Sequence, residues 1–352
     1  MLNRLFFFWY SAKACSSLLC VHEFSSFCGV SAKSVSTAMA CCSKGRVAAL
    51  SLRLRVASAF LAVYIIWGST YLAIRIVEES LPPFFMAGTR FVLSGAILYV
   101  WCRLRGSVHG SRSDWGRAFV VGGLMLLGGH GAVVWAEQWV PSGLTSLLVA
   151  TVPLWMAFSN WMWTKQKPDL RVGAGLVLGF IGVVLLAGGF ENLGASSVDV
   201  AGAAIVVFGA LLWANGSLFS RSPKFGGLGL LGTGLEMIAG GVLLLTASLA
   251  TGEWGRVRLD LVSIRSLIAW VYLVVFGALV GFTCYIWILK VASTARVSTY
   301  AYINPIVAMF LGWALANEPI TTRNILSAVI ILASVAVITT YQKQENTNQK
   351  IV

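Results

Sequence analysis

Apolar residues are grouped along this chain into long runs that are separated by short polar breaks. A helix needs about 20 mainly apolar residues to cross a hydrocarbon core about 30 Å thick. The first half of the chain contains five such runs, at residues 56–75, 84–104, 118–140, 142–163 and 172–190. The second half contains five more, at residues 200–220, 227–250, 267–289, 297–316 and 325–341. The pattern predicts an all-α integral membrane protein with ten transmembrane helices.

The two sets of five runs repeat one another. Three residues of the first half, Trp135, Pro153 and Arg171, recur 152 residues later as Trp287, Pro305 and Arg323. We therefore expect one repeat at residues 56–190 and a second at residues 200–341. Because each repeat holds an odd number of spans, equivalent helices must cross the membrane in opposite directions. This predicts two inverted repeats about an axis in the membrane plane, an arrangement found in many secondary transporters.

Basic residues mark alternate breaks and so predict the orientation. They are Lys44, Arg46, Arg53, Arg55, Arg103, Arg105, Arg112, Arg117, Lys165, Lys167, Arg171, Arg221, Lys224, Lys290 and Arg296. The opposite breaks carry the acids Glu78, Glu79, Glu137, Glu191, Asp199 and Glu318. Since cytoplasmic loops are enriched in Lys and Arg, both termini are expected in the cytoplasm. One break disagrees, because Arg256, Arg258 and Arg265 would lie outside.

The two ends of the chain differ from its apolar body. Residues 1–52 are rich in Ser and Cys and lack a run long enough to span. Three interpretations stay open for this extension: a misassigned start with the true one near Met39, a disordered cytoplasmic tail, or a transit-type leader. Residues 342–352 form a polar tail that we expect to be cytoplasmic, solvated and disordered.

Composition excludes a water-soluble protein, because 58% of the residues are hydrophobic and 11% are charged. The formal net charge of +13 would suit a nucleic-acid partner in a hydrophilic protein. Here the basic residues lie between apolar runs, so they indicate topology and no nucleic-acid binding is expected. Of the seven cysteines, only Cys102 and Cys284 lie in the apolar body, too few for a metal site. We expect no cofactor and no metal.

Several short motifs carry a resemblance to a known family. In the first half they are Trp67-Gly68-Ser69-Thr70-Tyr71 with Ile74-Arg75, Leu81-Pro82-Pro83 with Ala87-Gly88-Thr89-Arg90-Phe91, and Glu137-Gln138-Trp139-Val140-Pro141-Ser142-Gly143. In the second half they are Tyr300-Ala301-Tyr302-Ile303-Asn304-Pro305 and Glu318-Pro319. Over residues 56–341 the chain resembles the EamA family of the drug/metabolite transporter superfamily, and most of all its YedA-type exporters. The resemblance implies ten helices in two repeats, a central cavity and export of small metabolites or drugs. Gln166 departs from the acidic residue that the family often has there, and the leader has no family counterpart.

Two ionisable residues lie well inside predicted spans, Arg90 and Glu236. Such residues are costly in a bilayer and usually face protein or water. We expect them either to neutralise each other or to face a shared aqueous cavity. The alternatives are that Arg90 extends to the interface while Glu236 stabilises a helix contact, or that Glu236 is a proton-coupling carboxylate.

Aromatic and small polar residues within the spans suit a cavity for amphipathic molecules. The remaining candidates are Trp67, Ser69, Tyr71, His130, Trp135, Asn215, Tyr285, Trp287, Tyr300, Tyr302 and Asn304. Each could instead be a packing or interfacial residue. Asn304 and Tyr302 stand out because Pro305 opens the backbone hydrogen bonding beside them. Pro153 and Pro305 are expected to kink their helices at equivalent points.

These features predict a secondary transporter in the bacterial inner membrane that exports small metabolites or drug-like compounds, amino acids among them, by alternating access. Its partners would be the lipid bilayer and a small-molecule substrate, and we expect one chain to be sufficient. A sugar-phosphate or nucleotide-sugar exchanger is the alternative, although it would need several cationic groups in the cavity. A membrane receptor is a further alternative. The chain has no Walker A loop for ATP, and the spans contain no HExxH or GxSxG motif for an enzyme.

Overall fold

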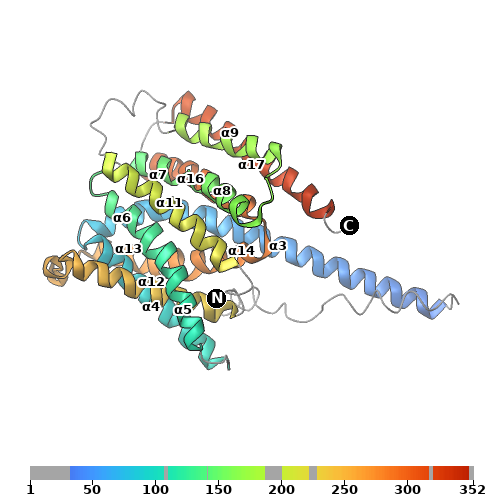
Figure 1. Cartoon of the computed structure of the whole chain (residues 1–352), viewed down its shortest axis with the longest axis horizontal. Helices are drawn as coiled ribbons and strands as arrows, with labels where there is room; N and C mark the ends of the chain where they lie inside the picture. Colours follow the sequence, from blue (N-terminus) through green and yellow to red (C-terminus); the bar gives the residue numbers. More distant parts are fainter. Residues whose placement is uncertain are drawn as a thin grey trace. The chain divides into compact units, whose positions relative to one another are not determined.

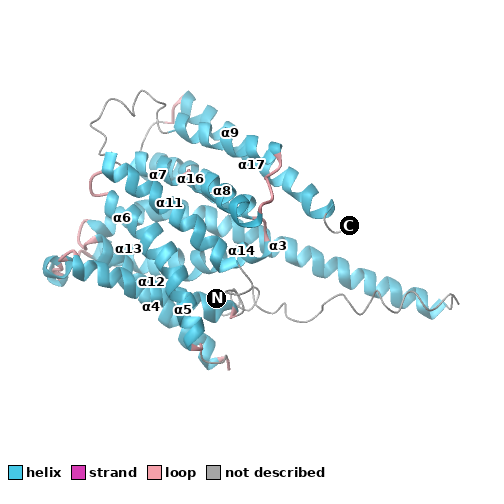
Figure 2. Ribbon diagram, in the orientation of Figure 1, coloured by secondary structure: helices cyan, strands magenta, loops and turns pink. Residues whose placement is uncertain are grey.

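The computed structural model describes residues 32–106, 110–140, 142–186, 200–221, 228–316 and 320–348. Every regular element formed by these residues is a helix (Figure 2). The chain divides into two units, Met1–Ala59 and Phe60–Val352. The second unit contains part of α3 and all the elements that follow it. Several residues of the sequence predictions lie outside the described ranges, namely 1–31, Pro141, Glu191, Asp199, Lys224, Glu318 and 349–352.

Within the described residues, seven helices are long and apolar enough to cross a membrane. They are Leu52–Glu78, Pro83–Leu104, Arg112–Ala136, Ala201–Arg221, Gly229–Ala250, Ile264–Val291 and Thr322–Tyr341. The first lies within α3 (Ala32–Glu78), and the second is α4 (Pro83–Leu104). The fourth and fifth correspond to α11 (Val200–Arg221) and α12 (Gly229–Ala250). All seven overlap predicted spans.

The other three predicted spans are occupied by shorter helices. Residues 142–163 contain α7 (Ser142–Val149) and most of α8 (Val152–Thr164). Residues 172–190 overlap α9 (Leu170–Leu186). Residues 297–316 contain the end of α15 (Thr294–Ser298) and all of α16 (Tyr300–Ala316). The fourth span is therefore broken at residues 150–151 and the ninth at residue 299.

Helices α4 and α12 pack closely through glycines. A Cβ atom at Gly95 would lie 2.8 Å from the carbonyl oxygen of Gly234. A Cβ atom at Gly241 would lie 3.0 Å from the carbonyl oxygen of Gly88. Later residues of α4 thus contact earlier residues of α12, so the two helices run antiparallel. Small residues allow this close backbone approach, as is common between helices in membranes.

Helices α9 and α17 (Thr322–Asn348) form a second antiparallel pair, at the top of Figure 1. A Cβ atom at Gly182 would lie 2.7 Å from Cγ1 of Ile331. One turn earlier, a Cβ atom at Gly179 would lie 2.6 Å from Oγ of Ser334. The repeat spacing of 152 residues relates Gly182 to Ser334 and Gly179 to Ile331. The contact of Gly182 with Ile331 is therefore the repeat equivalent of the contact of Ser334 with Gly179. The pair therefore has an approximate twofold relationship between repeat-equivalent residues.

Two long helices change to π-helical geometry at their centres. The segment η1 (Gly123–Gly131) links α5 (Arg112–Gly122) to α6 (Ala132–Ala136). The segment η4 (Leu273–Phe282) links α13 (Ile264–Tyr272) to α14 (Thr283–Val291). The repeat spacing of 152 residues carries η1 onto η4. π-Helical turns are rare and are concentrated at functional sites. Their occurrence in both halves therefore indicates that η1 and η4 are candidates for a functional site.

The two equivalent prolines occupy different local structures. Pro153 lies in the first turn of α8, where its missing N–H removes no intrahelical bond. Pro305 lies inside α16. We expected matching kinks at Pro153 and Pro305. The structure has a break between α7 and α8 just before Pro153, whereas α16 is continuous through Pro305.

The ends of the described chain are more helical than the sequence suggested. Helix α3 begins at Ala32, within the extension for which three interpretations stayed open. Helix α17 continues to Asn348, into the tail that we expected to be disordered. Polar composition opposes burial in a core, but it does not prevent continuation of a helix that has already begun.

Candidate functional site

A cavity of about 110 Å³ lies among helices of both halves. From the first half, α3, α4, η1, α6, α7 and α8 line it, and from the second half α11, η4 and α16. Its lining residues are Trp67, Thr70, Tyr71, Ile74, Arg90, Phe91, Gly129, His130, Val133, Glu137, Val149, Val152, Gly209, Ala210, Trp213, Gly277, Phe282, Tyr300 and Asn304. Most of them are apolar or aromatic, with few polar groups, as is typical of small-molecule sites.

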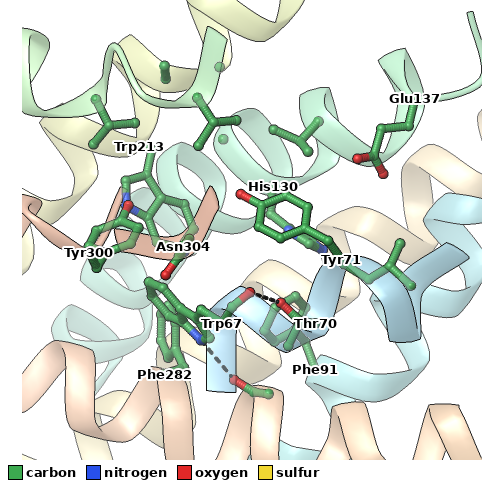
Figure 3. A pocket seen from close by; sticks show the side chains of 18 of the residues that line it. Trp67, Thr70, Tyr71, Phe91, His130, Glu137, Trp213, Phe282, Tyr300 and Asn304 are labelled. Atoms are coloured by element: carbon green, nitrogen blue, oxygen red, sulfur yellow. Dashed lines mark hydrogen bonds between the residues drawn. The ribbon is translucent and has the colours of Figure 1, made fainter. Parts of the chain in front are cut away.

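Four aromatic side chains form a mutual cluster, here called the aromatic cluster: Trp67, Trp213, Tyr285 and Tyr300. The ring centroids of Trp67 lie 4.9 Å from Tyr285, 5.0 Å from Tyr300 and 5.7 Å from Trp213. The Trp213 Nε1 donates to the Tyr285 hydroxyl at 3.1 Å. Figure 3 shows Trp213 and Tyr300 on the side of the cavity opposite Glu137. The aromatic cluster therefore bounds one end of the cavity.

The two π-helical segments contribute equivalent positions to the cavity wall. His130 of η1 and Phe282 of η4 are separated by the repeat spacing, and both line the cavity. The indole Nε1 of Trp67 donates to the carbonyl of Gly277 in η4 at 3.2 Å (Figure 3). A π-helix leaves its backbone bonding less regular, so a carbonyl can accept this additional bond.

Arg90 is the one basic side chain among the described lining residues, and 4% of its surface is exposed. Its Nη2 lies 2.6 Å from Nε2 of His130. Because a guanidinium group only donates, His130 Nε2 accepts and its ring proton is on Nδ1. The guanidinium also lies over the Phe91 ring, 4.5 Å from its centroid. Its Nε and Nη1 are buried and make no hydrogen bond to a described residue.

Asn304 supplies a second buried polar group to the cavity. Only 3% of its surface is exposed, and its Oδ1 has no hydrogen-bond partner among the described residues. It lies on α16 one residue before Pro305. The cavity thus offers unsatisfied donors on Arg90 and an unsatisfied acceptor on Asn304, between aromatic walls.

Six of the residues predicted from sequence line this cavity: Trp67, Tyr71, Arg90, His130, Tyr300 and Asn304. Tyr285 belongs to the aromatic cluster that bounds it. The other candidates lie outside the lining. Ser69 bonds to the Tyr272 hydroxyl at 2.6 Å, and Asn215 Nδ2 donates to the Leu211 carbonyl at 2.8 Å.

Three further aromatic candidates also lie outside the lining. Trp135 stacks on Phe84 with ring centroids 6.5 Å apart. Tyr302 is buried in the core between α9 and α17, where its hydroxyl donates to the Leu176 carbonyl at 2.7 Å. Trp287 is half-buried on α14.

The expected pairing of Arg90 with Glu236 differs from what the structure contains. Arg90 bonds to His130, whereas Glu236 accepts from Ser220 at 3.1 Å and interacts electrostatically with Lys290. Glu236 does not line the cavity. In this part of the repeats the spacing is 146 residues, because Arg90–Gly95 aligns with Glu236–Gly241, so Arg90 and Glu236 are equivalent. Helices α4 and α12 meet through glycines, and Arg90 and Glu236 have different neighbours.

Sequence reasoning missed Trp213 and Phe282 and assigned Glu137 to a loop, yet all three line the cavity. Phe282 could have been found, because the repeat spacing carries His130 onto it. Trp213 had no such signal, since one aromatic residue in an apolar run is indistinguishable from a packing residue. Among the described residues, no three His, Cys, Asp or Glu side chains come together as a metal site requires.

Comparisons with known proteins agree on one family. The model of the EamA-like transporter family matches residues 54–188 and again 200–340. The uncharacterized inner membrane transporter YedA of Escherichia coli K12 is 36% identical over 284 residues, covering 80% of this chain and 89% of YedA. The uncharacterized transporter YoaV of Bacillus subtilis is 24% identical over 292 residues, covering 80% of this chain and 95% of YoaV.

A solved crystal structure has the same fold. It superposes with a TM-score of 0.68 at 18% sequence identity, covering 82% of this chain and 98% of the other. Two matches to one family model within a single chain indicate repeated halves, and the family comprises transporters rather than enzymes. The chain is a multi-pass membrane protein and belongs to the EamA-like transporter family.

Proposed function

We propose that this protein is a secondary transporter that exports small metabolites across the bacterial inner membrane by alternating access. The observation that carries the proposal is the cavity walled by helices of both halves. Substrate sites between two repeats are typical of secondary transporters. The family and the inner-membrane relative support transport of a small molecule.

We infer that the two halves are inverted relative to one another. The antiparallel packing of α4 on α12 and of α9 on α17 supports this inference, because the contacting residues are equivalent in the repeats. Together with the distribution of basic residues, inversion corresponds to ten spans with both termini in the cytoplasm. Outer helix faces carry exposed apolar residues such as Leu61, Val177 and Phe310, as contact with lipid requires.

The arrangement corresponds to an outward-facing state under this topology. In the aromatic cluster, Tyr285 lies five residues before Lys290 and Tyr300 lies four residues after Arg296, and the proposed topology assigns Lys290 and Arg296 to the cytoplasmic side. Glu137, at the opposite side, belongs to a predicted outer break. Opening the aromatic cluster while closing the outer end would expose the same cavity to the cytoplasm.

The size and charge of the cavity favour small metabolites over other superfamily substrates. A cavity of about 110 Å³ is of the same order as the roughly 150 Å³ cavity that holds benzene. Sugar phosphates and nucleotide sugars carry two or more negative charges, whereas Arg90 is the one basic side chain among the described lining residues. All residues that line the cavity belong to one chain, so we propose that a monomer is sufficient.

A flux assay in proteoliposomes tests this proposal. Release of a panel of loaded amino acids, organic acids, nucleosides and drug-like compounds would be compared between protein-containing and empty liposomes. Val149→Trp, which fills the cavity, should abolish release. Val177→Trp, on an exposed face of α9, is the matched control and should transport normally. Equal release by both variants, or no release of any compound, would count against the proposal.

The same assay tests proton coupling through Glu236, which stays a proposal. Release would be measured with and without a pH gradient, in the wild type and in Glu236→Gln. Coupling requires that the gradient accelerate release by the wild type and that the variant lose this acceleration. Release that ignores the gradient would remove proton coupling.

A further inference from the structure

We propose that Arg90 and His130 form the binding site for the carboxylate of a compact organic anion with a single negative charge. The inference rests on the proposed function, since it names the chemical class of ligand that would occupy the cavity. The ligand would place its carboxylate on Arg90 and its apolar body between the aromatic walls.

Two nitrogens of the buried Arg90 guanidinium have no hydrogen-bond partner among the described residues. A buried Arg is ordinarily paired, because an uncompensated buried charge is costly. Here His130 is a neutral acceptor for one nitrogen, while Nε and Nη1 have no bond to a described residue. A guanidinium binds a carboxylate in bidentate fashion through two adjacent nitrogens, either Nη2 with Nε or Nη2 with Nη1. Nη2 of Arg90 has two N–H groups, so it keeps one N–H beyond its bond to His130 and can complete either pair. The free N–H groups of Arg90 therefore match the hydrogen-bonding pattern of a carboxylate.

No carboxylate among the described residues fills this role. The ion pairs among the described side chains are Arg117–Asp114 and Arg258–Asp260. Glu78 interacts electrostatically with Arg90 but forms no ion pair with it. Glu137 lines the same cavity, and its negative charge would oppose entry of a second negative charge on the ligand. The balance favours a monoanion over a phosphate dianion.

The rest of the cavity restricts the body of the ligand. Trp67, Phe91, Trp213 and Phe282 present aromatic rings, which favour a planar apolar group. The unpartnered Oδ1 of Asn304 can accept from a hydroxyl or amino group on the ligand. Hydroxy acids and amino acids share this chemistry, and the experiment below separates them.

Binding to the purified full chain in detergent tests the inference with a series of similar shape. Phenylacetate, phenylacetamide, mandelate, phenylglycine and phenyl phosphate would be titrated by calorimetry. We expect phenylacetate to bind at least tenfold more tightly than its neutral amide and more tightly than phenyl phosphate. Mandelate and phenylglycine distinguish a hydroxyl from an amino donor to Asn304, and a gain for either supports the site. Equal affinities for phenylacetate and phenylacetamide would overturn it.

Three variants test whether the preference for the acid over the amide depends on Arg90. Arg90→Gln should remove the tenfold preference for the acid over the amide. Arg90→Lys keeps the charge but loses bidentate geometry, so phenylacetate should bind about fivefold more weakly even if the glutamine variant fails to fold. Arg258→Gln, an exposed arginine outside the cavity, is the control and should bind as wild type. Unchanged phenylacetate affinity in Arg90→Lys would overturn the site.

The outcomes also separate this inference from the proposed transport. Binding that depends on Arg90, combined with no flux of any compound, would contradict transport while the anion site stands. Flux of neutral and cationic compounds that is insensitive to Arg90→Lys would contradict the anion site while transport stands.

Discussion

Trp67 in the first half of the chain closes on Gly281 in the second, where a Cβ atom would lie 2.6 Å from the indole Nε1. The repeat spacing relates Gly281 to Gly129. A Cβ atom at Gly129 would lie 2.9 Å from Cβ of Trp213. Each half therefore contributes a tryptophan that packs on a glycine in the π-helical segment of the other half, beside the cavity.

Alanine at Gly281 should displace the Trp67 indole and weaken its bond to the Gly277 carbonyl. We expect a loss of about 1–3 kcal/mol in the free energy of unfolding, as overpacking usually costs, together with reduced flux. Thermal unfolding in detergent and the liposome assay measure the two effects. Gly123→Ala in η1 is the control, because its Cβ would meet only Leu243 Cδ1, at 3.4 Å. An equal response of both variants would contradict the role of the contact.

Glu253 provides a second link between segments distant in sequence. Its carboxylate accepts from the backbone N–H groups of Phe84 at 3.3 Å and Phe85 at 2.9 Å, at the start of α4. Its surface is 1% exposed. Because the carboxylate satisfies two free donors at a helix N-terminus, Glu253→Ala should lower stability by about 1–3 kcal/mol. The midpoint of thermal unfolding should fall, whereas the exposed Glu79→Ala should leave it unchanged.

The Tyr285 hydroxyl should couple energetically to Ser217. It lies 2.7 Å from the Ser217 Oγ and accepts from Trp213 Nε1, and Tyr285 is fully buried. Tyr285→Phe leaves both groups without this partner, at a cost of about 1–2 kcal/mol. A double-mutant cycle with Ser217→Ala, followed by thermal unfolding, should give a coupling of about 0.5–1.5 kcal/mol. Strict additivity would show that the bond contributes nothing.

Two glycines of α9, Gly179 and Gly173, differ in how closely other residues pack against them. A Cβ atom at Gly179 would lie 2.6 Å from both Ser334 Oγ and Tyr302 Cε2, whereas one at Gly173 would meet no atom within 4 Å. Gly179→Ala should therefore lower the unfolding temperature. Gly173→Ala should hold or raise it, since alanine is favoured over glycine in helices by about 1 kcal/mol. Equal shifts for the two variants would refute close packing at Gly179.

The sequence predicted the helices well because a bilayer requires long apolar runs, and the seven long helices all overlap predicted spans. The repeat spacing also anticipated which helices would be equivalent. Side-chain direction was harder to predict. Tyr302 and Asn304 are two residues apart on α16, yet Tyr302 packs into the core and Asn304 lines the cavity. Helix rotation decides which of two such neighbours faces a cavity, and no local pattern encodes it.

The π-helical segments were not predicted either. Their sequences, at Gly123–Gly131 and Leu273–Phe282, are apolar and rich in glycine, which also fits an ordinary α-helix. A change of helical pitch depends on tertiary contacts, such as those of Trp67 with Gly277 and Gly281. Once η1 is known, the repeat spacing of 152 residues predicts the position of η4, and no feature of the η4 sequence does so.

The glycine contacts between α4 and α12 bear on the origin of the chain. Gly88 and Gly95 are separated by seven residues, as are their repeat equivalents Gly234 and Gly241. Gly88 contacts Gly241 and Gly95 contacts Gly234, so each glycine contacts the equivalent of the other. Such a surface is self-complementary, as in a homodimer with twofold symmetry. Gene duplication followed by fusion would preserve every contact of such a dimer and add only the high effective concentration of a covalent link. Divergence of the two copies after such a fusion would account for Arg90 in one half at the position where the other half has Glu236.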